Sequence, residues 1–432
     1  MRTSTTGSVA VIGAGFSGLG AAAALKRRGI PFDVYEAEDD VGGNWLNGVY
    51  ETVHLISSRK TTAYAEYPMP ETYPDFPGAR QMLEYLRSYA EHFDLRPHIR
   101  FRTRVVGVEP REDGAWTVRL ATGEVLVHRA VVVCIGHDWD ARYPEYPGRF
   151  DGEILHAKQY KEPSVLRGKR VLVVGGGNSA CDIAVEAGRF ADAAHLSVRR
   201  GYWFLPRTIM GIPLPELSSP WMPVWLQRLT LQAALKVIVG DYRRYGLPRP
   251  DHRLFERHPT INSDLLQALK LGRITPHPDI RRLDGSHVEF TNGTREAFDL
   301  IIYATGYHLS FPLLQDGILT WRNGVPQLLG GFIHPNLKNL YFLELHFVRY
   351  GLGPLISAQA DAIAALIDVQ DRLEAPAGML LQRLGVRPVR TLMSGPFEVI
   401  RFARRIARFA GWLPRIESVL PRTVPLPATA AS

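Results

Sequence analysis

A glycine-rich turn near the N-terminus limits the possible folds of this chain more than any other feature. Residues 8–12 (SVAVI) form a short apolar run typical of a buried parallel strand, and residues 13–18 (GAGFSG) follow it directly. Residues 19–28 have the pattern of a helix, and residues 32–36 predict a second strand that ends at Glu36. A strand, a glycine turn, a helix and an acidic residue in this order indicate a dinucleotide-binding unit.

The physical role of each part of this pattern is known. The glycines permit a tight turn and let backbone N–H groups approach a pyrophosphate at the helix N-terminus. Glu36 is predicted to accept hydrogen bonds from a ribose. The candidate contacts to this first nucleotide are Gly13, Gly15, Phe16, Ser17, Gly18 and Glu36.

The same pattern recurs in the middle of the chain. Residues 169–174 predict a strand, residues 175–180 (GGGNSA) a turn, residues 181–189 a helix and residues 195–199 a further strand. In place of the acid of the first copy stand Arg199 and Arg200. Guanidinium groups pair with phosphate, so these arginines predict a ribose with a 2′-phosphate, and the alternative is that they are merely solvated. The two copies therefore predict one site for an unphosphorylated adenosine and one for NADP(H).

The order of the remaining strands predicts how the two units are connected. Residues 130–136 and 300–306 each form a buried strand that ends at glycine and closes one half. Residues 340–343 and a helix predicted over 357–370 come after the second half and need a sheet on which to pack. We therefore predict an α/β fold with two Rossmann-like domains, the NADPH domain inserted into the FAD domain. The predicted boundaries are 1–160 and 306–395 for the first domain, 161–305 for the second with a helical insertion at 205–257, and 396–432 for a basic amphipathic tail.

Cysteine usage and the N-terminal segment narrow the class of protein. The two cysteines, Cys134 and Cys181, lie 47 residues apart and outside any metal-binding pattern, so a redox-active cysteine pair, as in the disulfide reductases, is not expected. A reducing, cytoplasmic setting is expected. Five glycines interrupt the uncharged stretch 3–25, which favours a strand, turn and helix over a signal peptide or membrane span.

The chain resembles the flavin-containing monooxygenases over about residues 8–365. Its most specific element is residues 150–160 (FDGEILHAKQY), which are similar to the family signature F-x-G-x-x-x-H-x-x-x-[YF]. Further similar stretches are residues 42–45 (GGNW), 73–78 (YPDFPG), 177–186 (GNSACDIAVE), 258–262 (HPTIN) and 304–307 (ATGY).

The resemblance implies both cofactors and a reaction. It implies FAD in the first site, with Gly43, Asn44 and Trp45 near the flavin. It implies NADPH in the second site, on Asn178, Ser179 and Ala180 beside Gly175 and Gly177, and it adds Thr305 and Gly306 to the cofactor-binding set. In this family NADPH reduces FAD, the reduced flavin captures dioxygen, and a C4a-hydroperoxide gives one oxygen to a nitrogen or sulfur of a hydrophobic small molecule. The oligomeric state is left open.

His156 and Tyr160 of the signature have two interpretations. They take part directly in catalysis, or they anchor the crossover between the two nucleotide units by hydrogen bonds. Related Baeyer–Villiger monooxygenases usually carry tryptophan at the position of Tyr160, but some with tyrosine insert oxygen beside a carbonyl. Oxygenation of a ketone is therefore the alternative reaction.

One position departs from the resemblance. Where members of the family typically carry an asparagine near the flavin and NADP⁺, this chain has Ile56. The adjacent Ser57 and Ser58 are candidates to supply the missing polar contact. If they do not, the alternative is a non-oxygenating NADPH oxidase or flavin-binding protein.

Two amphipathic segments lie outside the nucleotide units. Residues 224–239 predict a helix with a wide apolar face. Three interpretations of this helix are open: it covers the substrate entrance as a lid, it contacts lipid, or it packs on the core. In residues 397–432, six arginines stand against two glutamates, and an apolar stripe runs through Phe402, Ile406, Phe409 and Leu413 beside the arginines. This tail either contacts an anionic membrane surface peripherally or docks on the protein itself. Residues 425–432 are expected to be disordered.

The net charge of +8 does not indicate a nucleic-acid partner. No recognised nucleic-acid-binding module is present, and the excess arginine is accounted for by cofactor phosphates and by the tail.

Overall fold

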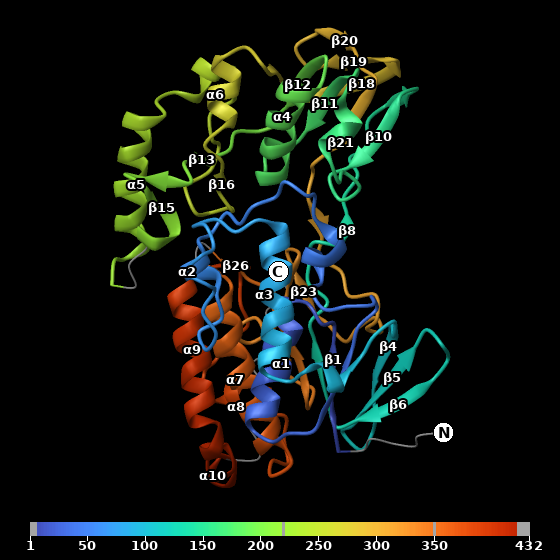
Figure 1. The fold of residues 1–432 in the computed structure, drawn as a ribbon. Coiled ribbons are helices and arrows are strands. Elements are labelled where there is room, and N and C mark those ends of the chain that lie inside the picture. The colour runs from blue at the N-terminus through green and yellow to red at the C-terminus, as the bar shows by residue number, and fades with distance from the viewer. Residues whose placement is uncertain (1–6, 218–220, 349–350, 421–432) are drawn as a thin grey trace.

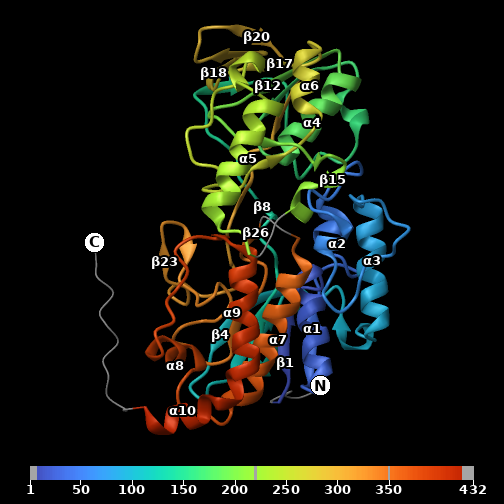
Figure 2. The same cartoon turned by 90° about the vertical axis from the view of Figure 1, so that its left-hand side faces the viewer.

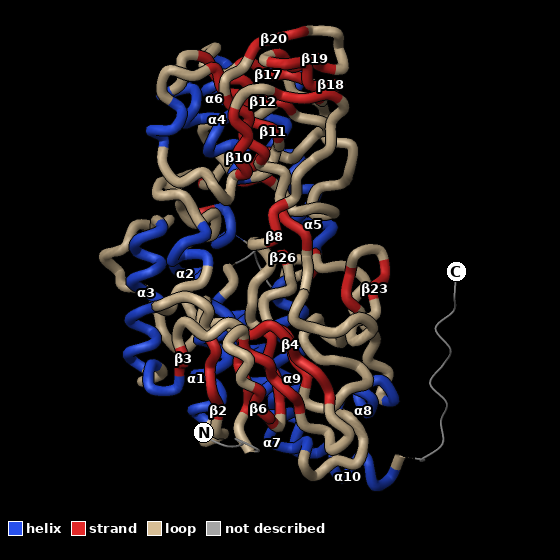
Figure 3. Tube along the Cα trace, turned by 90° about the vertical axis from the view of Figure 1, so that its right-hand side faces the viewer, coloured by secondary structure: helices blue, strands red, loops and turns tan. Residues whose placement is uncertain are grey.

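The protein has two lobes, each built around a five-stranded parallel sheet (Figures 1 and 3). The computed structural model describes residues 7–217, 221–348 and 351–420. In Figure 1 the blue N-terminal and the orange and red C-terminal segments share the lower lobe, whereas the green and yellow middle of the chain forms the upper lobe. The second nucleotide unit is therefore inserted into the first, and the predicted fold class is confirmed.

The first sheet has the strand order β25-β7-β1-β2-β3, and all its pairs are parallel. Its strands are β1 (Val9–Ile12), β2 (Phe32–Tyr35), β3 (Ile99–Arg100), β7 (Ala130–Val133) and β25 (Leu340–Phe342). Every residue of β1 is buried, as expected for an apolar central strand that is covered on both faces. Strand β25 pairs with β7, so residues beyond the second unit complete the sheet of the first.

Each face of this sheet is covered by a different layer. The helices are α1 (Phe16–Arg27), α2 (Arg59–Thr62), α3 (Ala79–His92), α7 (Gly353–Gln370) and α8 (Ala377–Arg383), and α1 packs against α7 on one face. The other face is covered by the antiparallel strands β4 (Val105–Pro110), β5 (Trp116–Leu120) and β6 (Val125–His128), whose Trp116 and Val118 share a buried cluster with Ala10 and Ile12.

The second sheet repeats this plan with the order β10-β21-β11-β12-β17. Its strands are β10 (Glu153–His156), β11 (Arg170–Val174), β12 (Ala193–Ser197), β17 (Thr275–His277) and β21 (Leu300–Tyr303). Helices α4 (Asn178–Phe190) and α6 (Leu265–Lys270) cover one side of this sheet, and their buried residues share a hydrophobic cluster with those of β11. A second layer contains β9 (Gly148–Phe150), β18 (Ile280–Gly285), β19 (His287–Phe290) and β20 (Arg295–Ala297).

The helices after both glycine turns begin earlier than predicted. Helix α1 starts at Phe16 and α4 at Asn178, three residues before the predicted starts at Leu19 and Cys181. The glycines before them are extended, with φ −78° and ψ −166° at Gly15, and φ −81° and ψ −178° at Gly177. The fingerprint residues therefore form the first helical turn themselves.

The insertion and the residues that flank it contain short strands, two 3-10 helices (Leu214–Leu217 and Tyr242–Tyr245) and one longer helix, α5 (Val224–Ile238). The strands are β13 (Phe204–Leu205), β14 (Thr208–Ile209), β15 (Ile212–Pro213) and β16 (Thr260–Ile261). Further two-stranded pairs are β8 (Asp140–Ala141) with β22 (Tyr307–His308), β23 (Trp321–Arg322) with β24 (Val325–Pro326), and β26 (Phe347–Val348) with β27 (Met393–Ser394).

The C-terminal amphipathic helix docks on the protein's own body. Helix α9 (Pro396–Phe409) runs beside α7 and leads into α10 (Leu413–Val419), as Figure 2 shows. Ile406 and Leu413 of the predicted stripe are buried in the main core, and Phe402 is partly buried. Phe409 remains 54% exposed. The expected disorder of residues 425–432 lies outside the described residues.

Two further expectations concern membranes and cysteines. Within the described ranges, no helix is both long and apolar enough to cross a bilayer, and the N-terminal glycine-rich stretch forms β1 and α1 from residue 9 onward. Cys134 and Cys181 are buried free thiols in the nucleotide units.

Candidate functional site

The first cradle lies at the carboxyl end of β1, where the chain turns into α1. Gly13 has a φ of +101°, and a Cβ placed on it would lie 2.6 Å from the carbonyl oxygen of Cys134. A Cβ on Gly18 would lie 1.8 Å from the carbonyl oxygen of Gly13, so α1 packs directly on the turn. No side chain caps α1 at Gly15, so its first-turn N–H groups remain for an anion.

Three side chains complete the surroundings of this cradle. Glu36 accepts hydrogen bonds from the backbone N–H groups of Ala14 at 2.6 Å and Glu38 at 2.9 Å, which hold its carboxylate beside the turn. Each carboxylate oxygen has further acceptor capacity for a ribose hydroxyl. The ring of Phe16 stacks on Tyr64 at 4.3 Å, so only the backbone of Phe16 is left to serve a nucleotide.

Gly43, Asn44 and Trp45 lie across from this turn. A Cβ on Gly43 would stand 2.9 Å from the Cα of Gly15, so the two glycine backbones face each other. Asn44 begins a single π-helical turn (Asn44–Gly48), and its amide donates to the carbonyl of Asp138 at 3.3 Å. Trp45 packs partly buried against the main core. The backbone of Gly43 therefore lies directly against the turn between β1 and α1.

The second cradle repeats the first at the end of β11. Gly175 has a φ of +142°, and a Cβ there would lie 2.3 Å from the carbonyl oxygen of Ala304. No side chain caps α4 at Gly177, and a Cβ on that residue would meet only open space. Ala180 is fully buried against the turn, and the side-chain oxygen of Asn178 accepts from the N–H of Ile261 at 2.7 Å. Asn178 therefore also fixes the 258–262 stretch beside this cradle.

Arg199 and Arg200 follow β12 beside this second cradle. Arg199 is exposed, and Arg200 is half-buried with its guanidinium over the ring of Tyr202 at 5.4 Å. The Nε of Arg200 is buried and makes no hydrogen bond within the described structure. A guanidinium group beside a dinucleotide cradle can pair with a phosphate.

His156 has both ring nitrogens occupied by the backbone. Its Nε2 donates to the carbonyl of Gly306 at 3.2 Å, and its Nδ1 accepts from the N–H of Lys158 at 3.1 Å. Burial lowers the pKa of His156, which favours this neutral tautomer. His156 is fully buried, so its place in the structure is that of an anchor.

Gly306 and Thr305 belong to the connection between the two lobes. The hydroxyl of Thr305 donates to the carbonyl of Arg142, and the N–H of Arg142 donates to the carbonyl of Gly306 at 3.0 Å. Strands β8 and β22 pair here, so the two chain crossovers lie side by side. His156 thus holds one crossover against the other.

Tyr160 anchors a second joint between the lobes. It is fully buried, and its hydroxyl donates to the carboxylate of Glu186, which also accepts from the hydroxyl of Thr52. Burial raises the pKa of Tyr160, so the hydroxyl remains a donor. Glu186 on α4 is therefore tied to residue 52 of the first unit.

Asp182, one helical turn before Glu186, extends this joint. Its carboxylate accepts from the hydroxyl of Tyr50 at 2.9 Å, the amide of Asn262 at 2.7 Å and the guanidinium of Arg207 at 3.1 Å. Ser179, in the first turn of the same helix, lies near Tyr50. Burial raises the pKa of Asp182, and the positive charge of Arg207 opposes that shift. Asp182 and Asn262 lie in stretches that resemble the family, but their pairing across the joint was not predicted from the sequence.

Substitution of Tyr160 by phenylalanine separates the two interpretations of this residue. It leaves the Glu186 carboxylate without one donor in a buried joint, so we expect the free energy of unfolding to fall by about 1–3 kcal/mol. The rate of flavin reduction by NADPH should stay close to that of the wild type. Urea denaturation and anaerobic stopped-flow absorbance measure the two quantities.

The matched control is Tyr143→Phe, because Tyr143 is 50% exposed and hydrogen-bonds the side chain of Gln159 at 3.1 Å. Unchanged stability together with a strong loss of flavin reduction in Tyr160→Phe would instead make Tyr160 a catalytic residue.

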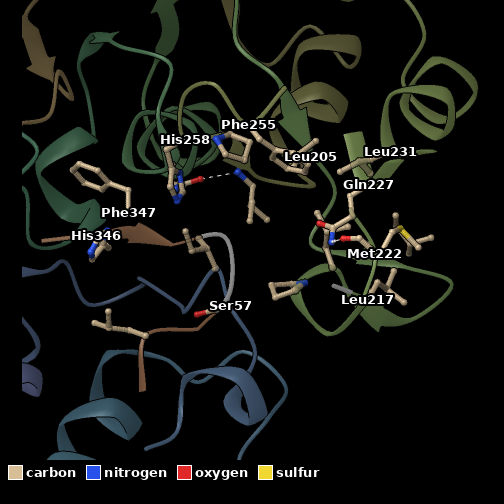
Figure 4. A pocket seen from close by; sticks show the side chains of 18 of the residues that line it. Ser57, Leu205, Leu217, Met222, Gln227, Leu231, Phe255, His258, His346 and Phe347 are labelled. Carbon is tan, nitrogen blue, oxygen red and sulfur yellow. Dashed lines mark hydrogen bonds between the residues drawn. The ribbon is translucent and has the colours of Figure 1, made fainter. Parts of the chain in front are cut away.

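A cavity of about 600 Å³ lies beside the second cradle, between the insertion and the segments that follow β7 and β25 of the first lobe (Figure 4). The insertion supplies a mainly apolar wall: Leu205, Ile209, Leu214, Pro215, Leu217, Met222, Gln227, Thr230, Leu231, Ala234 and Phe255. The lobes supply Ile56, Ser57, His137, Asp138, Asn178, His258, Pro259, Ile261, Glu344, His346, Phe347 and Leu352. The cavity therefore has an apolar side and a side rich in polar groups.

Ile56, Ser57 and Ser58 occupy three different environments. Ile56 lines the cavity and packs partly buried against the cluster of Leu205 and Leu235. Ser57 also lines the cavity, and its hydroxyl hydrogen-bonds that of Thr62 at 2.6 Å. Ser58 is fully buried and accepts from the N–H of Thr61 as the N-cap of α2. Of the two serines, only Ser57 is therefore placed to meet a ligand.

Helix α5 forms a wall of the cavity. Leu235 is its only buried residue, whereas Leu231 and Ala234 line the cavity and Trp225 and Leu229 are 64% and 59% exposed. The side chain of Gln227 donates to the carbonyl of Met222 at 2.8 Å, so one of the few polar groups on this wall is held by the protein itself (Figure 4). The helix therefore separates the cavity from solvent, in agreement with the lid interpretation.

Several polar cavity residues were missed from the sequence. Asp138 follows β7, and Glu344 and His346 follow β25, at the carboxyl edge where ligands of parallel sheets bind. Each of these residues follows a buried apolar strand in the sequence, and that position would have allowed us to predict them as site residues.

Comparisons with known proteins agree with this geometry. A family model described as flavin-binding monooxygenase-like matches residues 6–360. Flavin-containing monooxygenase 5 of Oryctolagus cuniculus is 34% identical over 359 residues, which cover 76% of this chain and 67% of the relative. Dimethylaniline monooxygenase [N-oxide-forming] 2 of the same species is 32% identical over 389 residues, covering 82% and 71%. Cyclohexanone monooxygenase from Rhodococcus sp. Phi1, solved with NADP⁺ bound, superposes with a TM-score of 0.71 at 18% identity and covers 94% of this chain and 98% of that one.

Proposed function

Because this chain belongs to the flavin-binding monooxygenase-like family and is an FAD- and NADPH-dependent monooxygenase, we propose that it oxygenates a soft nitrogen or sulfur nucleophile of a hydrophobic small molecule. The observation that carries this proposal is the cavity beside the second cradle, with its apolar wall from the insertion. An apolar wall of this kind selects a hydrophobic substrate body and excludes water from the reacting centre.

We assign the first cradle to FAD and the second to NADPH. In this assignment Gly13, Gly15 and Glu36 contact the flavin nucleotide, whereas Gly175, Gly177 and Arg200 contact the phosphorylated nicotinamide nucleotide; the tight glycine turns and the carboxylate held beside the first turn support it. FAD and NADPH together supply the electrons and the activation of dioxygen. The chain's own part is to bind both cofactors, to orient them across the joints at His156 and Tyr160 and to keep water out.

The charges around the cavity favour a nitrogen or sulfur nucleophile over a ketone. Addition to a ketone builds negative charge on the carbonyl oxygen, and a cationic side chain stabilises such charge. Among the described residues that line the cavity there is no lysine or arginine, whereas Asp138 and Glu344 are acidic. A neutral thioether or amine develops no negative charge on the substrate as it attacks, so these carboxylates do not oppose its reaction.

The experiment that tests the proposal offers a hydrophobic thioether and a cyclic ketone together, with NADPH and air. We expect the sulfoxide to accumulate in step with NADPH consumption. Accumulation of the lactone would overturn the choice of a soft nucleophile. NADPH consumption matched entirely by hydrogen peroxide would instead indicate the non-oxygenating alternative.

The wall formed by α5 gives a prediction about the substrate. Leu231→Asp places a charge on the cavity side of the helix, and burying a charge against apolar groups is strongly unfavourable. We expect the KM for the thioether to rise by about tenfold or more, which corresponds to at least about 1.4 kcal/mol. FAD content and the KM for NADPH should stay unchanged.

The matched control is Leu229→Asp, two residues earlier on the same helix, where the side chain is 59% exposed. Steady-state kinetics of both variants measure the effect. An equal KM for the thioether in the two variants would contradict a substrate-binding role for this wall.

A further inference from the structure

Helix α9 carries a row of four arginines on the face that points away from the core. Arg401, Arg404, Arg405 and Arg408 are spaced three or four residues apart, so they share one face of the helix, and all four are exposed. The opposite face of α9 is buried in the main core, where the helix packs against α7. Docking of α9 on the protein therefore holds these four arginines, here called the basic strip, on the outside of the first lobe.

The charge of the basic strip is not compensated by ion pairs. Elsewhere on the surface arginines pair with acids, as Arg119 does with Glu109 at 2.7 Å and Arg282 with Glu289 at 2.6 Å. None of the four arginines of the strip forms an ion pair with a residue of the described ranges, and Glu398, the acid of α9, lies in the first helical turn. The strip is therefore suited to an anionic partner.

Large apolar side chains are exposed next to the basic strip. Phe409 ends α9 and Trp412 follows it, and both are more than half exposed, as is Val419 at the end of α10. The guanidinium of Arg415 lies over the ring of Trp412 at 5.2 Å. Aromatic rings beside cations are typical of surfaces that lie at the boundary of a lipid bilayer, where the rings enter the headgroup region and the cations meet phosphate.

Helix α5 of the second lobe lies on the same side of the molecule as α9, at the left in Figure 1 and toward the viewer in Figure 2. Trp225, Leu229 and Val237 stand four or eight residues apart on α5 and form one exposed row, here called the apolar stripe. The cavity-lining Leu231 and Ala234 belong to another face of this helix. One side of the molecule thus combines an apolar stripe in one lobe with a basic strip in the other.

This combination fits an anionic lipid bilayer better than a nucleic acid. A nucleic acid offers phosphates to the arginines and bases that stack on exposed rings, but it offers nothing to the aliphatic side chains of Leu229, Val237 and Val419. An anionic bilayer offers phosphates to the basic strip, and its headgroup region accepts both aromatic and aliphatic side chains.

We propose that this side of the molecule docks on an anionic lipid bilayer, with the basic strip against lipid phosphates and the apolar stripe in the headgroup region. The inference goes beyond the proposed function and does not depend on which cofactor binds in which cradle. Because α5 is also a wall of the cavity, docking places the cavity beside a phase in which hydrophobic substrates concentrate.

The test is sedimentation of the full chain, as purified, with lipid vesicles. One set of vesicles is phosphatidylcholine alone, and the other also contains anionic phosphatidylglycerol. We expect binding to the anionic set, weak binding to the neutral set and loss of binding as salt is added. The Arg404→Ser, Arg405→Ser, Arg408→Ser triple variant should raise the apparent dissociation constant by about 100-fold, since each cation near an anionic bilayer strengthens binding by about fivefold.

The matched control is the Arg102→Ser, Arg104→Ser, Arg111→Ser triple variant, which removes the same charge. These three arginines are exposed and flank β4, in the layer that covers the other face of the first sheet. The control should bind the anionic vesicles like the wild type. The Trp225→Ser, Leu229→Ser double variant keeps the charge and should weaken binding by about tenfold. Thermal unfolding followed by circular dichroism shows that each variant is folded.

Failure of the wild type to sediment with the anionic vesicles overturns the inference, and so does an equal loss of binding in the two triple variants. Wild-type binding by the Trp225→Ser, Leu229→Ser variant overturns the part assigned to α5. A mixed-sequence DNA duplex that binds more tightly than the vesicles at the same salt, and loses affinity in the α9 triple variant, assigns the basic strip to nucleic acid instead.

Discussion

The Gly13→Ala variant is expected to purify as a folded protein without flavin. Gly13 combines a φ of +101° with a Cβ position 2.6 Å from the carbonyl oxygen of Cys134, so an alanine has to displace the turn. The first-turn N–H groups of α1 move with that turn, and the pyrophosphate loses its contacts. We expect the dissociation constant for FAD to rise by about 100-fold or more, equivalent to at least about 2.7 kcal/mol.

The control for this prediction is Gly29→Ala at the end of α1. Gly29 also has a positive φ, +67°, but a Cβ there meets nothing within 4 Å. This variant carries a similar conformational cost without distorting the cradle, and it should remain yellow. Absorbance of the purified proteins measures bound flavin, and NADP⁺ binding to the second cradle reports the fold. A Gly13→Ala protein with a full complement of FAD would contradict the assignment of this cradle.

The second large effect is expected on cofactor choice when both arginines after β12 are removed. In the Arg199→Ser, Arg200→Ser double variant, the 2′-phosphate of NADPH loses charge-assisted hydrogen bonds worth about 1.5–3 kcal/mol each. We expect the dissociation constant for NADPH to rise by about 100-fold or more. That for NADH should change little, because NADH lacks this phosphate.

Anaerobic titrations with the two nucleotides measure this change in preference. Arg189→Ser is the control, because Arg189 is an exposed arginine in the last turn of α4. The single variants apportion the effect between the two arginines. An equal loss of affinity for NADPH and NADH would show that the arginines support the fold and do not read the phosphate.

The parts of the fold that depend on local pattern were predictable from the sequence. A glycine turn between a buried strand and a helix has few alternative structures, so both cradles were predicted from their residues alone. The return of β25 to the first sheet was also predictable, because an apolar strand after the second unit needs a parallel partner. The helix starts were misplaced because the fingerprint residues themselves form the first turn at Phe16 and Asn178.

The parts of the site that depend on long-range contacts were not predictable. His156 and Tyr160 were recognised as special, but their roles as anchors follow from Gly306 and Glu186, which lie 150 and 26 residues away along the chain. The apolar pattern of α5 is the same for a core helix and a cavity wall, so only the packing distinguishes them.

The serines after Ile56 show a missed local signal. Ser58 and Thr61 stand three residues apart at a helix start, a spacing typical of a capping box, and their side chains are used in that way. The spacing by itself therefore favours Ser58 as the helix cap and leaves Ser57 as the serine available to a ligand.

The most direct measurement is made with heavy oxygen gas. The FAD-loaded protein is reduced anaerobically with NADPH, mixed with the labelled gas and a hydrophobic thioether, and the product is analysed by mass spectrometry. We expect a sulfoxide that contains one labelled oxygen atom, in an amount that matches the NADPH consumed. Recovery of unreacted substrate for every thioether and amine tested, with all reducing equivalents found as hydrogen peroxide, would contradict the proposed function.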